Sequence, residues 1–393
     1  MPGMKERLAA VDALRGLVMI IMALDHVRDF VHRSAMSSSP TDLRVASTVL
    51  FFTRWVTHMC APVFMLTAGL GAYFYLVRRS PGEGGWRRGG RTKGQLSWFL
   101  VTRGVWLIAL ELTVMQLAYN FDVSVSYPVF LLVLWALGAC MIILAGLVWL
   151  PIPVLAIVSA AVVVSHHLLD GTPLPLLHQV SALPFAGRVF IAPYTLIPWF
   201  AVMALGYCMG PIFEKPADER RRWLFGIGVG LTLAFVVVRG LNSYGDSAPW
   251  SGPRVVLSFL NTTKYPPSLA FLLMTLGPAL VLLAWFERAS FSRPNPLIVF
   301  GRVPLFYFVL HFLMAHAIAV LLAIGTYGSA AWSFMFQPVP SMGGQAQAFP
   351  PGFGWDLWVV YAVWIALVAA LYPVCLWFSK VKERRQAWWL SYL

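Results

Sequence analysis

The sequence predicts an all-α polytopic membrane protein, and two observations carry this prediction. Hydrophobic residues make up 59% of the 393 residues and charged residues only 11%, whereas a soluble protein carries about 25% charged residues. The apolar residues also form long blocks rather than amphipathic patterns, as expected of segments that cross a bilayer. We therefore expect residues 1–393 to form a single membrane-embedded domain of about 10 helices.

Ten apolar segments are long enough to cross a hydrocarbon core of about 30 Å. They cover residues 8–31, 53–77, 97–119, 127–149, 151–168, 194–212, 223–239, 267–286, 303–325 and 357–378. Only the motif 150-LPIP-153 separates the fifth segment from the fourth. An even number of spans would place both termini on the same side of the membrane.

The distribution of basic residues predicts which side that is. With the N-terminus in the cytoplasm, 20 of the 29 Lys and Arg residues fall on the cytoplasmic side and 8 on the outer side, while Arg15 lies within the first span. This excess is the positive-inside bias, so we expect both termini in the cytoplasm. The net charge of +13 does not indicate nucleic-acid binding, because the basic residues lie in the links between apolar blocks.

The first span carries polar residues on one face at both of its ends. Asp12 and Arg15 are spaced to pair with each other, and we expect Arg28 to point away from the face they share. Asp25 falls at the edge of this face. At helical spacing the face continues through Met19, Met22, His26 and Asp29.

Other titratable residues fall at similar depths in other spans. Counting from the ends of the spans places six of them in the outer half of the membrane: Asp25, His26, Asp29, His58, Glu111 and His316. His311 falls near the middle. Such residues usually face a water-filled interior, so we predict a polar chamber that opens outward and is suited to proton transfer by histidine. No metal-ligand spacing, catalytic triad or phosphate-binding loop appears.

Four blocks of the sequence resemble membrane acyltransferases related to heparan-α-glucosaminide N-acetyltransferase, in the bacterial branch of that family. The first block, 7-RLAAVDALRGLVMIIMALDH-26, carries an Asp followed three residues later by Arg-Gly. The other blocks are 52-FTRWVTHMCAPVFMLTAG-69, 263-TKYPPSLAFLLMTLGPAL-280 and 300-FGRVPLFYFVLHF-312. The resemblance implies an enzyme of a bacterial inner membrane that moves an acetyl group from cytoplasmic acetyl-CoA to a sugar on the other side. It also suggests a homodimer.

The resemblance implies roles for particular residues. Arg15, Arg103 and Arg302, near the inner ends of helices, would bind the polyanionic acyl-CoA. Residues of the outer half would bind the sugar or glycan acceptor, namely Arg54, Glu111, Lys264 and His311. The lipid bilayer is the remaining expected partner, and no metal is implied.

The sequence alone does not decide which histidine is catalytic. In the animal lysosomal member the catalytic histidine lies in the outer segment after the first helix, and an asparagine occupies the helix end. Here the helix end carries His26, and only His32 lies between it and His58. We favour His26, with Asp29 as the orienting carboxylate and Asp25 as the second candidate for that role. A proton-coupled transporter of a small solute is the alternative function, because it would need the same titratable residues.

Overall fold

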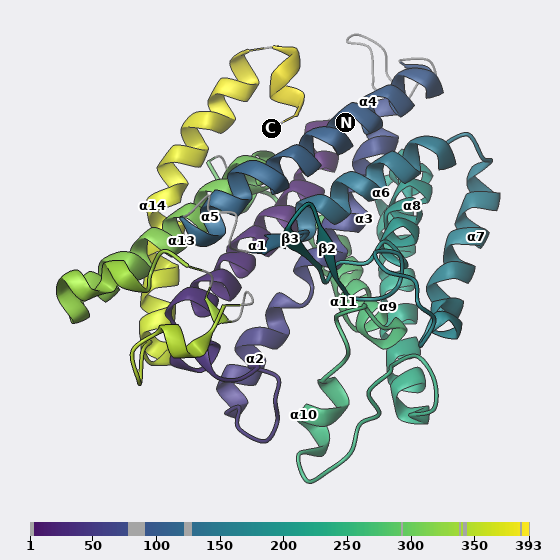
Figure 1. Ribbon diagram of the computed structural model, residues 1–393. Helices are drawn as coiled ribbons and strands as arrows, with labels where there is room; N and C mark the ends of the chain where they lie inside the picture. The colour runs from purple at the N-terminus through teal and green to yellow at the C-terminus, as the bar shows by residue number, and fades with distance from the viewer. Residues whose placement is uncertain are drawn as a thin grey trace.

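The structure is a computed structural model that describes residues 4–77, 91–121, 128–291, 294–337, 339–340, 344–385 and 387–392 (Figure 1). Helices dominate it, which confirms the predicted all-α class. Their bounds are α1 Met4–Val31, α2 Thr48–Thr57, α3 Cys60–Leu76, α4 Lys93–Leu110, α5 Gln116–Asn120, α6 Val133–Leu147, α7 Ile152–Ser165, α8 Trp199–Cys208, α9 Ala217–Leu241, α10 Val255–Leu260, α11 Leu269–Phe286, α12 Pro296–Arg302, α13 Pro304–Tyr327 and α14 Leu357–Arg384. Every segment expected from the sequence overlaps a helix, although residue 127, the expected start of the fourth, lies outside the described residues.

Among the described residues, 7 helical stretches are long and apolar enough to cross a membrane. They are Thr48–Leu76, Lys93–Asn120, Ile152–Leu169, Ala217–Leu241, Leu269–Phe286, Pro304–Ser333 and Leu357–Arg384. Two apolar helices, Val133–Leu147 and Trp199–Glu214, are shorter. The charged helix α1 is not among these stretches. The chain is therefore a multi-pass membrane protein, while the expected ten spans and their orientation stay predictions.

Pairs of glycines bring helices into close contact at four crossings. A Cβ atom added to Gly104 would lie 2.5 Å from the carbonyl oxygen of Gly138, and the reverse is also true. Small residues at such crossings let helix backbones approach closely, which favours helix association in lipid. The four pairs are Gly16 and Gly301 between α1 and α12, Gly69 and Gly206 between α3 and α8, Gly104 and Gly138 between α4 and α6, and Gly228 and Gly277 between α9 and α11.

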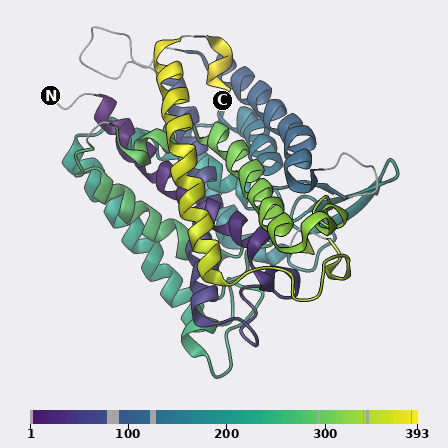
Figure 2. The ribbon, with the colours of Figure 1, turned by 90° about the vertical axis from the view of Figure 1, so that its left-hand side faces the viewer.

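Helix α1 runs through the centre of the bundle. It contacts α2, α3 and α11 as well as α12, α13 and α14, and α14 crosses in front of it in Figure 2. Many of its apolar side chains are fully buried, such as Leu14, Val18, Val27 and Phe30, while Leu17, Ile20 and Ile21 are partly buried. The charged residues Asp12, Arg15, Asp25, Arg28 and Asp29 of this helix are buried or partly buried within the protein.

Two of the long helical stretches are interrupted close to the polar residues at the C-terminal end of α1. The span 48–76 breaks between α2 and α3, and His58 stands at this break. The span 93–120 contains a π-helical stretch, Glu111–Met115, between α4 and α5. Irregular turns of this kind occur often at functional sites.

A small sheet covers part of the same end of the bundle. Its strands are β1 Val129–Phe130, β2 Ser181–Phe185 and β3 Arg188–Ala192. β2 and β3 form an antiparallel hairpin whose turn, Ala186–Gly187, has two residues with positive φ, and β1 pairs with β3 in parallel. The outer loop expected between the fifth and sixth spans thus contains ordered β-structure.

Candidate active site

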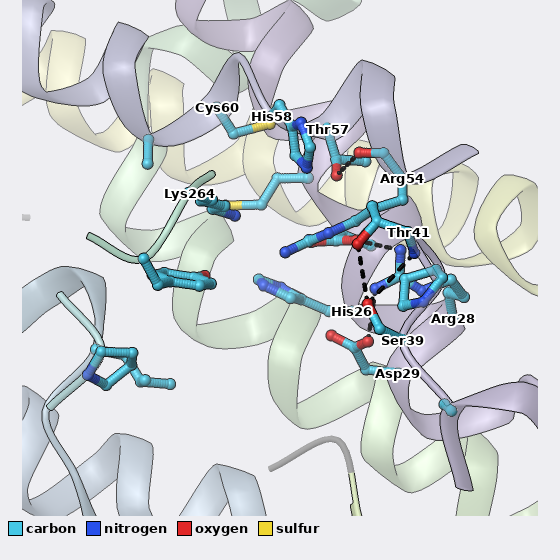
Figure 3. A pocket seen from close by; sticks show the side chains of 18 of the residues that line it. His26, Arg28, Asp29, Ser39, Thr41, Arg54, Thr57, His58, Cys60 and Lys264 are labelled. Atoms are coloured by element: carbon cyan, nitrogen blue, oxygen red, sulfur yellow. Dashed lines mark hydrogen bonds and ion pairs between the residues drawn. The ribbon is translucent and has the colours of Figure 1, made fainter. Parts of the chain in front are cut away.

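A cavity of about 920 Å³ lies at the C-terminal end of α1, and we call it the polar chamber (Figure 3). Its walls come from the end of α1, the loop 34–41, the α2–α3 break, residues 261–265 and α13. The chamber brings together six of the predicted site residues: Asp25, His26, Asp29, Arg54, His58 and Lys264. A polar chamber in this part of the bundle was therefore predictable from the sequence.

An ion-pair network occupies one wall of the chamber. Asp25 is paired with Arg54 of α2 and, at 2.7 Å, with Arg28 of its own helix. Arg28 also donates a hydrogen bond of 2.7 Å to the Asp29 carboxylate. The expectation that Arg28 points away was wrong: it is 3% exposed, lines the chamber and joins both carboxylates. Its long, flexible stem lets the guanidinium turn back towards residues three positions before and one position after it.

His26 is paired with a second histidine rather than with the expected carboxylate. Its Nδ1 lies 2.6 Å from Nε2 of His311 on α13, and the Nδ1 of His311 lies 3.0 Å from the carbonyl oxygen of Tyr307. A carbonyl can only accept, so His311 carries its proton on Nδ1. With both rings neutral, His311 Nε2 accepts a hydrogen bond from His26 Nδ1. The remaining nitrogen of His26, Nε2, then has a free lone pair.

His58 and Lys264 enter the chamber from two other segments, as Figure 3 shows. His58 is buried, and among the described residues its Nδ1 has no hydrogen-bond partner. The Lys264 ammonium lies 5.2 Å from the ring centre of Tyr265. Burial raises the pKa of the Tyr265 phenol, but the charges of Lys264 and Arg54, together with hydrogen bonds to Tyr194 and Lys264, outweigh this effect and lower it. This wall of the chamber therefore favours negative charge.

Glu111 and His316 lie outside the lining of the chamber. The Glu111 carboxylate accepts hydrogen bonds from the backbone N–H groups of Leu134 and Trp135, at 2.8 and 3.1 Å, and from the Tyr119 hydroxyl. It thus satisfies the first turn of α6, which otherwise has no acceptor. His316 lies between the carbonyl groups of Ala118 and Met335. Both residues join elements of the bundle to one another.

A second cavity, of about 540 Å³, lies towards the N-terminal end of α1. We call it the arginine cavity, because Arg15, Arg91 and Arg103 line it among mainly apolar side chains. Arg15 donates a hydrogen bond of 2.6 Å to the Thr67 carbonyl. Arg302, the third predicted donor-binding residue, does not line this cavity. It pairs with Asp12 and Glu383 and thereby links α12 to α1 and α14.

Several residues that line the two cavities could not be predicted from the sequence. The loop 34–41 and the segment 261–263 supply hydroxyl and amide groups to the chamber, and Tyr119 and Tyr194 supply phenols. In the arginine cavity, Arg91 stacks over the Tyr75 ring at 3.7 Å. None of these residues interrupts an apolar block, so hydropathy alone could not distinguish them from ordinary loop residues.

These features define a class of protein, a helical membrane protein with a histidine-containing chamber at one end of a central helix and an arginine cavity towards the other. The family model "Heparan-alpha-glucosaminide N-acetyltransferase, catalytic" matches residues 7–244. Because this range is more than half of the chain, the chain belongs to that family, as the resemblance implied. Membership assigns it a membrane N-acetyltransferase type of function. No curated protein matches the chain.

Proposed function

We propose that the chain transfers an acetyl group from acetyl-CoA to a carbohydrate or amino-sugar acceptor, with the two substrates on opposite sides of the membrane. The observation that carries this proposal is that two unlike cavities meet beside His26. Phe64, Val133 and Phe308 line both the polar chamber and the arginine cavity. The ring centre of Phe308 is 6.3 Å from that of His26.

The arginine cavity fits an acyl-CoA. It combines three guanidinium groups, from Arg15, Arg91 and Arg103, with apolar walls from α3, α4, α6 and α13. Guanidinium groups suit phosphates, and the apolar walls suit the pantetheine arm. The positive-inside bias supports a cytoplasmic location for this end of the bundle.

The polar chamber fits a sugar acceptor. It offers Arg54 and Lys264 as cations, hydroxyl groups from the loop 34–41, and the amide of Asn261. Sugars are bound through such hydrogen-bonding groups, and the cations would favour an acceptor that also carries an anionic group. Glu111, which was expected to bind the acceptor, does not line this chamber and accepts hydrogen bonds from the first turn of α6.

His26 is the group we assign as general base. Its Nε2 removes a proton from the acceptor hydroxyl or amine as that atom attacks the thioester carbonyl. The carbon–sulfur bond then breaks, and the thiolate of CoA takes the proton from His26. His311 acts as a positioning residue, because its hydrogen bond leaves the free lone pair on Nε2 of His26. A positioned base of this kind typically contributes 10² to 10⁴-fold to the rate.

The same reasoning supports a location in a bacterial inner membrane with both termini in the cytoplasm. In that orientation the polar chamber faces outward and receives an acceptor from the periplasmic side. A homodimer, suggested by the family resemblance, can be checked by the mass of the protein in detergent.

Transfer is tested with purified protein, acetyl-CoA and a panel of amino sugars and glycans, with the acylated product followed by mass spectrometry. We expect product and free CoA in equal amounts. We expect His26→Gln to lower kcat by about 100-fold or more and to leave acetyl-CoA binding intact. His58→Gln is the matched comparison, since His58 is the other chamber histidine. A loss of kcat only in His58→Gln would move the base to that residue.

Sidedness is tested in sealed proteoliposomes with acetyl-CoA inside and the acceptor outside, or the reverse. If neither CoA release nor product appears, and thermal stability does not respond to CoA, the proposal is wrong. Proton-driven solute uptake that His26→Ala abolishes, in a protein that does not bind CoA, would identify the transporter alternative instead.

A further inference from the structure

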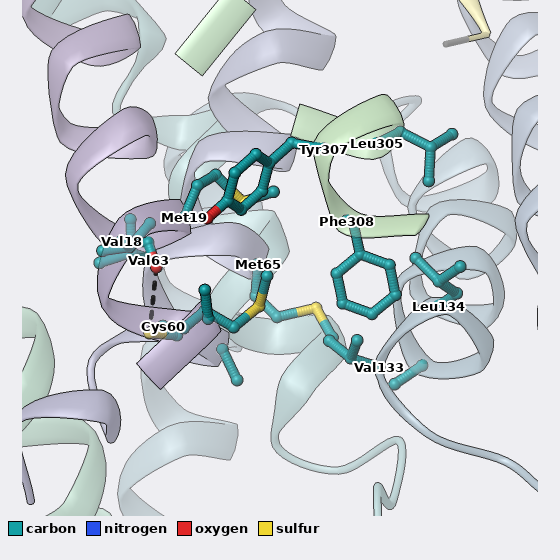
Figure 4. Close-up of a cluster of buried hydrophobic side chains, with 14 of the residues drawn as sticks. Val18, Met19, Cys60, Val63, Met65, Val133, Leu134, Leu305, Tyr307 and Phe308 are labelled. Atoms are coloured by element: carbon teal, nitrogen blue, oxygen red, sulfur yellow. Dashed lines mark hydrogen bonds between the residues drawn. The ribbon is translucent and has the colours of Figure 1, made fainter. Parts of the chain in front are cut away.

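The two cavities are separated by a neck, defined as the three side chains that line both of them, Phe64, Val133 and Phe308. The three residues come from α3, α6 and α13, so the neck depends on the packing of three helices. Figure 4 draws Phe308 together with Val133 and Leu134 in a buried apolar cluster. Val133 is 9% exposed and Phe308 is 5% exposed, whereas Phe64 is partly exposed. The side chains shared by the two cavities are thus all apolar.

We propose that this neck selects the length of the acyl group. The inference rests on the proposed function, because it assumes that a thioester in the arginine cavity reacts with an acceptor in the polar chamber. The reacting carbonyl must lie at the neck to reach both His26 and the acceptor. The acyl chain attached to that carbonyl then lies against Phe64, Val133 and Phe308.

The geometry around Phe308 makes this residue the main determinant. Its ring centre lies 5.5 Å from that of His311 and 5.9 Å from that of Phe312, as well as beside His26. The Phe308 ring is therefore enclosed by His26, His311 and Phe312. It has little room to move aside for a longer chain. Each added methylene should cost about 10 to 200-fold in kcat/KM, the range found for apolar substrate pockets.

The reaction retains its stoichiometry for every acyl length. The acceptor oxygen or nitrogen forms a bond to the acyl carbon, the carbon–sulfur bond breaks, and the acceptor proton passes through His26 to the departing thiolate. No oxidant or other co-reactant is needed. The acetyl, propionyl and butyryl donors differ only in the volume of the acyl group that must fit at the neck.

The test compares kcat/KM for acetyl-, propionyl- and butyryl-CoA in the wild type, Phe308→Ala and Phe306→Ala. Phe306 is a matched control on the same helix, because its ring stacks on Phe378 at 4.2 Å and lines neither cavity. We expect a steep fall with chain length in the wild type and in Phe306→Ala. In Phe308→Ala the ratio of butyryl to acetyl transfer should rise at least tenfold.

A folded and active Phe308→Ala enzyme with an unchanged ratio would overturn the proposal, as would a wild type that uses all three donors equally. If Phe308→Ala does not fold, Val133→Ala replaces it, with the same expected direction of change. A wild type that neither binds CoA nor releases it would instead contradict the proposed function. CoA binding measured by calorimetry therefore separates the two failures.

Discussion

At the scale of single residues, Arg28 shows what a helical projection of one segment cannot predict. A projection assigns each side chain a direction from its Cα atom, which suits short side chains such as Asp25 and Asp29. An arginine stem reaches several ångströms further and can turn back along the helix. Arg28 does so because the carboxylates of Asp25 and Asp29 lie on the chamber side. The polar character of this helix end could be predicted, but the pairing within it could not.

The pairing of His26 with His311 was beyond prediction for a different reason. The two residues are 285 positions apart in the chain, and no pattern around either residue predicts a contact with the other. Their contact follows from the way α13 packs on α1. His311 was expected to bind the acceptor, whereas its Nε2 faces His26 and its Nδ1 faces a backbone carbonyl.

We expect His311→Leu to lower kcat by about 100-fold or more, with KM for both substrates nearly unchanged. The reason is that the leucine cannot accept from His26 Nδ1, so the proton is free to move to Nε2. A triad whose histidine adopts the wrong tautomer loses activity in the same way. Steady-state kinetics with acetyl-CoA measure the effect, and His311→Gln should restore part of kcat because its side-chain oxygen can accept.

The control for this prediction is His316→Leu on the same helix. His316 contacts only the carbonyl groups of Ala118 and Met335 among the hydrogen-bond partners described here. Its loss should lower the thermal midpoint and leave kcat per folded molecule unchanged. Equal losses of kcat in the two variants would indicate that His311 supports the structure rather than the base.

At the scale of elements, the glycine crossings decide how closely the helices approach. Two glycines of α9 flank a third that lies in a crossing, which gives an internal comparison. A Cβ atom on Gly228 would lie 2.8 Å from backbone atoms of Gly277 and Val281, whereas Gly226 and Gly230 have nothing within 4 Å. Sequence alone does not distinguish the three.

We therefore expect opposite effects from two alanine substitutions in α9. Gly228→Ala should destabilise the protein by about 1–3 kcal/mol, because the backbone of α11 must move. Gly226→Ala should be neutral or stabilising by up to about 1 kcal/mol, because alanine favours the helix. Thermal unfolding in one detergent measures both. Similar shifts in the two variants would mean that the crossing tolerates a wider separation.

The stability that the loop after α1 gives to the folded protein should depend on pH through His32. The His32 ring accepts a hydrogen bond of 3.2 Å from the Ser34 backbone N–H and so begins the 3-10 helix Arg33–Met36. Burial, together with the positive charges of Arg28 and Arg33, lowers the pKa of His32. The folded state therefore binds its proton less readily than the unfolded state does.

The direction of the pH dependence of stability follows from this lowered pKa. The stabilisation from neutral His32 is complete above about pH 6.5, the usual value for histidine, and is lost progressively as the pH falls below it. We expect the thermal midpoint to decrease between pH 7 and pH 5.5, and to decrease less in His32→Asn. Asparagine can still cap the turn but does not titrate. Parallel curves for the two proteins would exclude this role for His32.

At the scale of the whole molecule, composition and periodicity were sufficient for the fold class and for a polar chamber. The seven stretches long enough to cross a membrane follow directly from the apolar blocks. The short helices α10 and α12 and the three strands were not expected, because they are too short to produce a hydropathy signal. The predicted ligand-binding roles of Glu111 and Arg302 stay predictions, but neither residue lines the polar chamber or the arginine cavity. A buried charge can serve a helix end or join two helices as well as bind a ligand.

This distinction gives a prediction about the three arginines expected to bind the donor. Arg103 lines the arginine cavity, whereas Arg302 is held by Asp12 and Glu383. We expect Arg103→Gln to raise KM for acetyl-CoA about tenfold or more, since a charged hydrogen bond contributes about 1.5–3 kcal/mol. Arg302→Gln should lower stability without a comparable change in KM. The reverse pattern would place the donor beside Arg302, at the C-terminal end of α12.

The neck has an electrical consequence. A membrane voltage falls mainly across the layer that excludes ions, and moving one charge through 100 mV changes the free energy by about 2.3 kcal/mol. If the two cavities open to opposite sides of the membrane, as proposed, that layer is reduced to the side chains that line both, Phe64, Val133 and Phe308. We therefore expect turnover in sealed vesicles to depend on a potassium diffusion potential, because the acceptor proton is transferred beside this layer. The three side chains that we propose to select the acyl group would also carry most of the voltage.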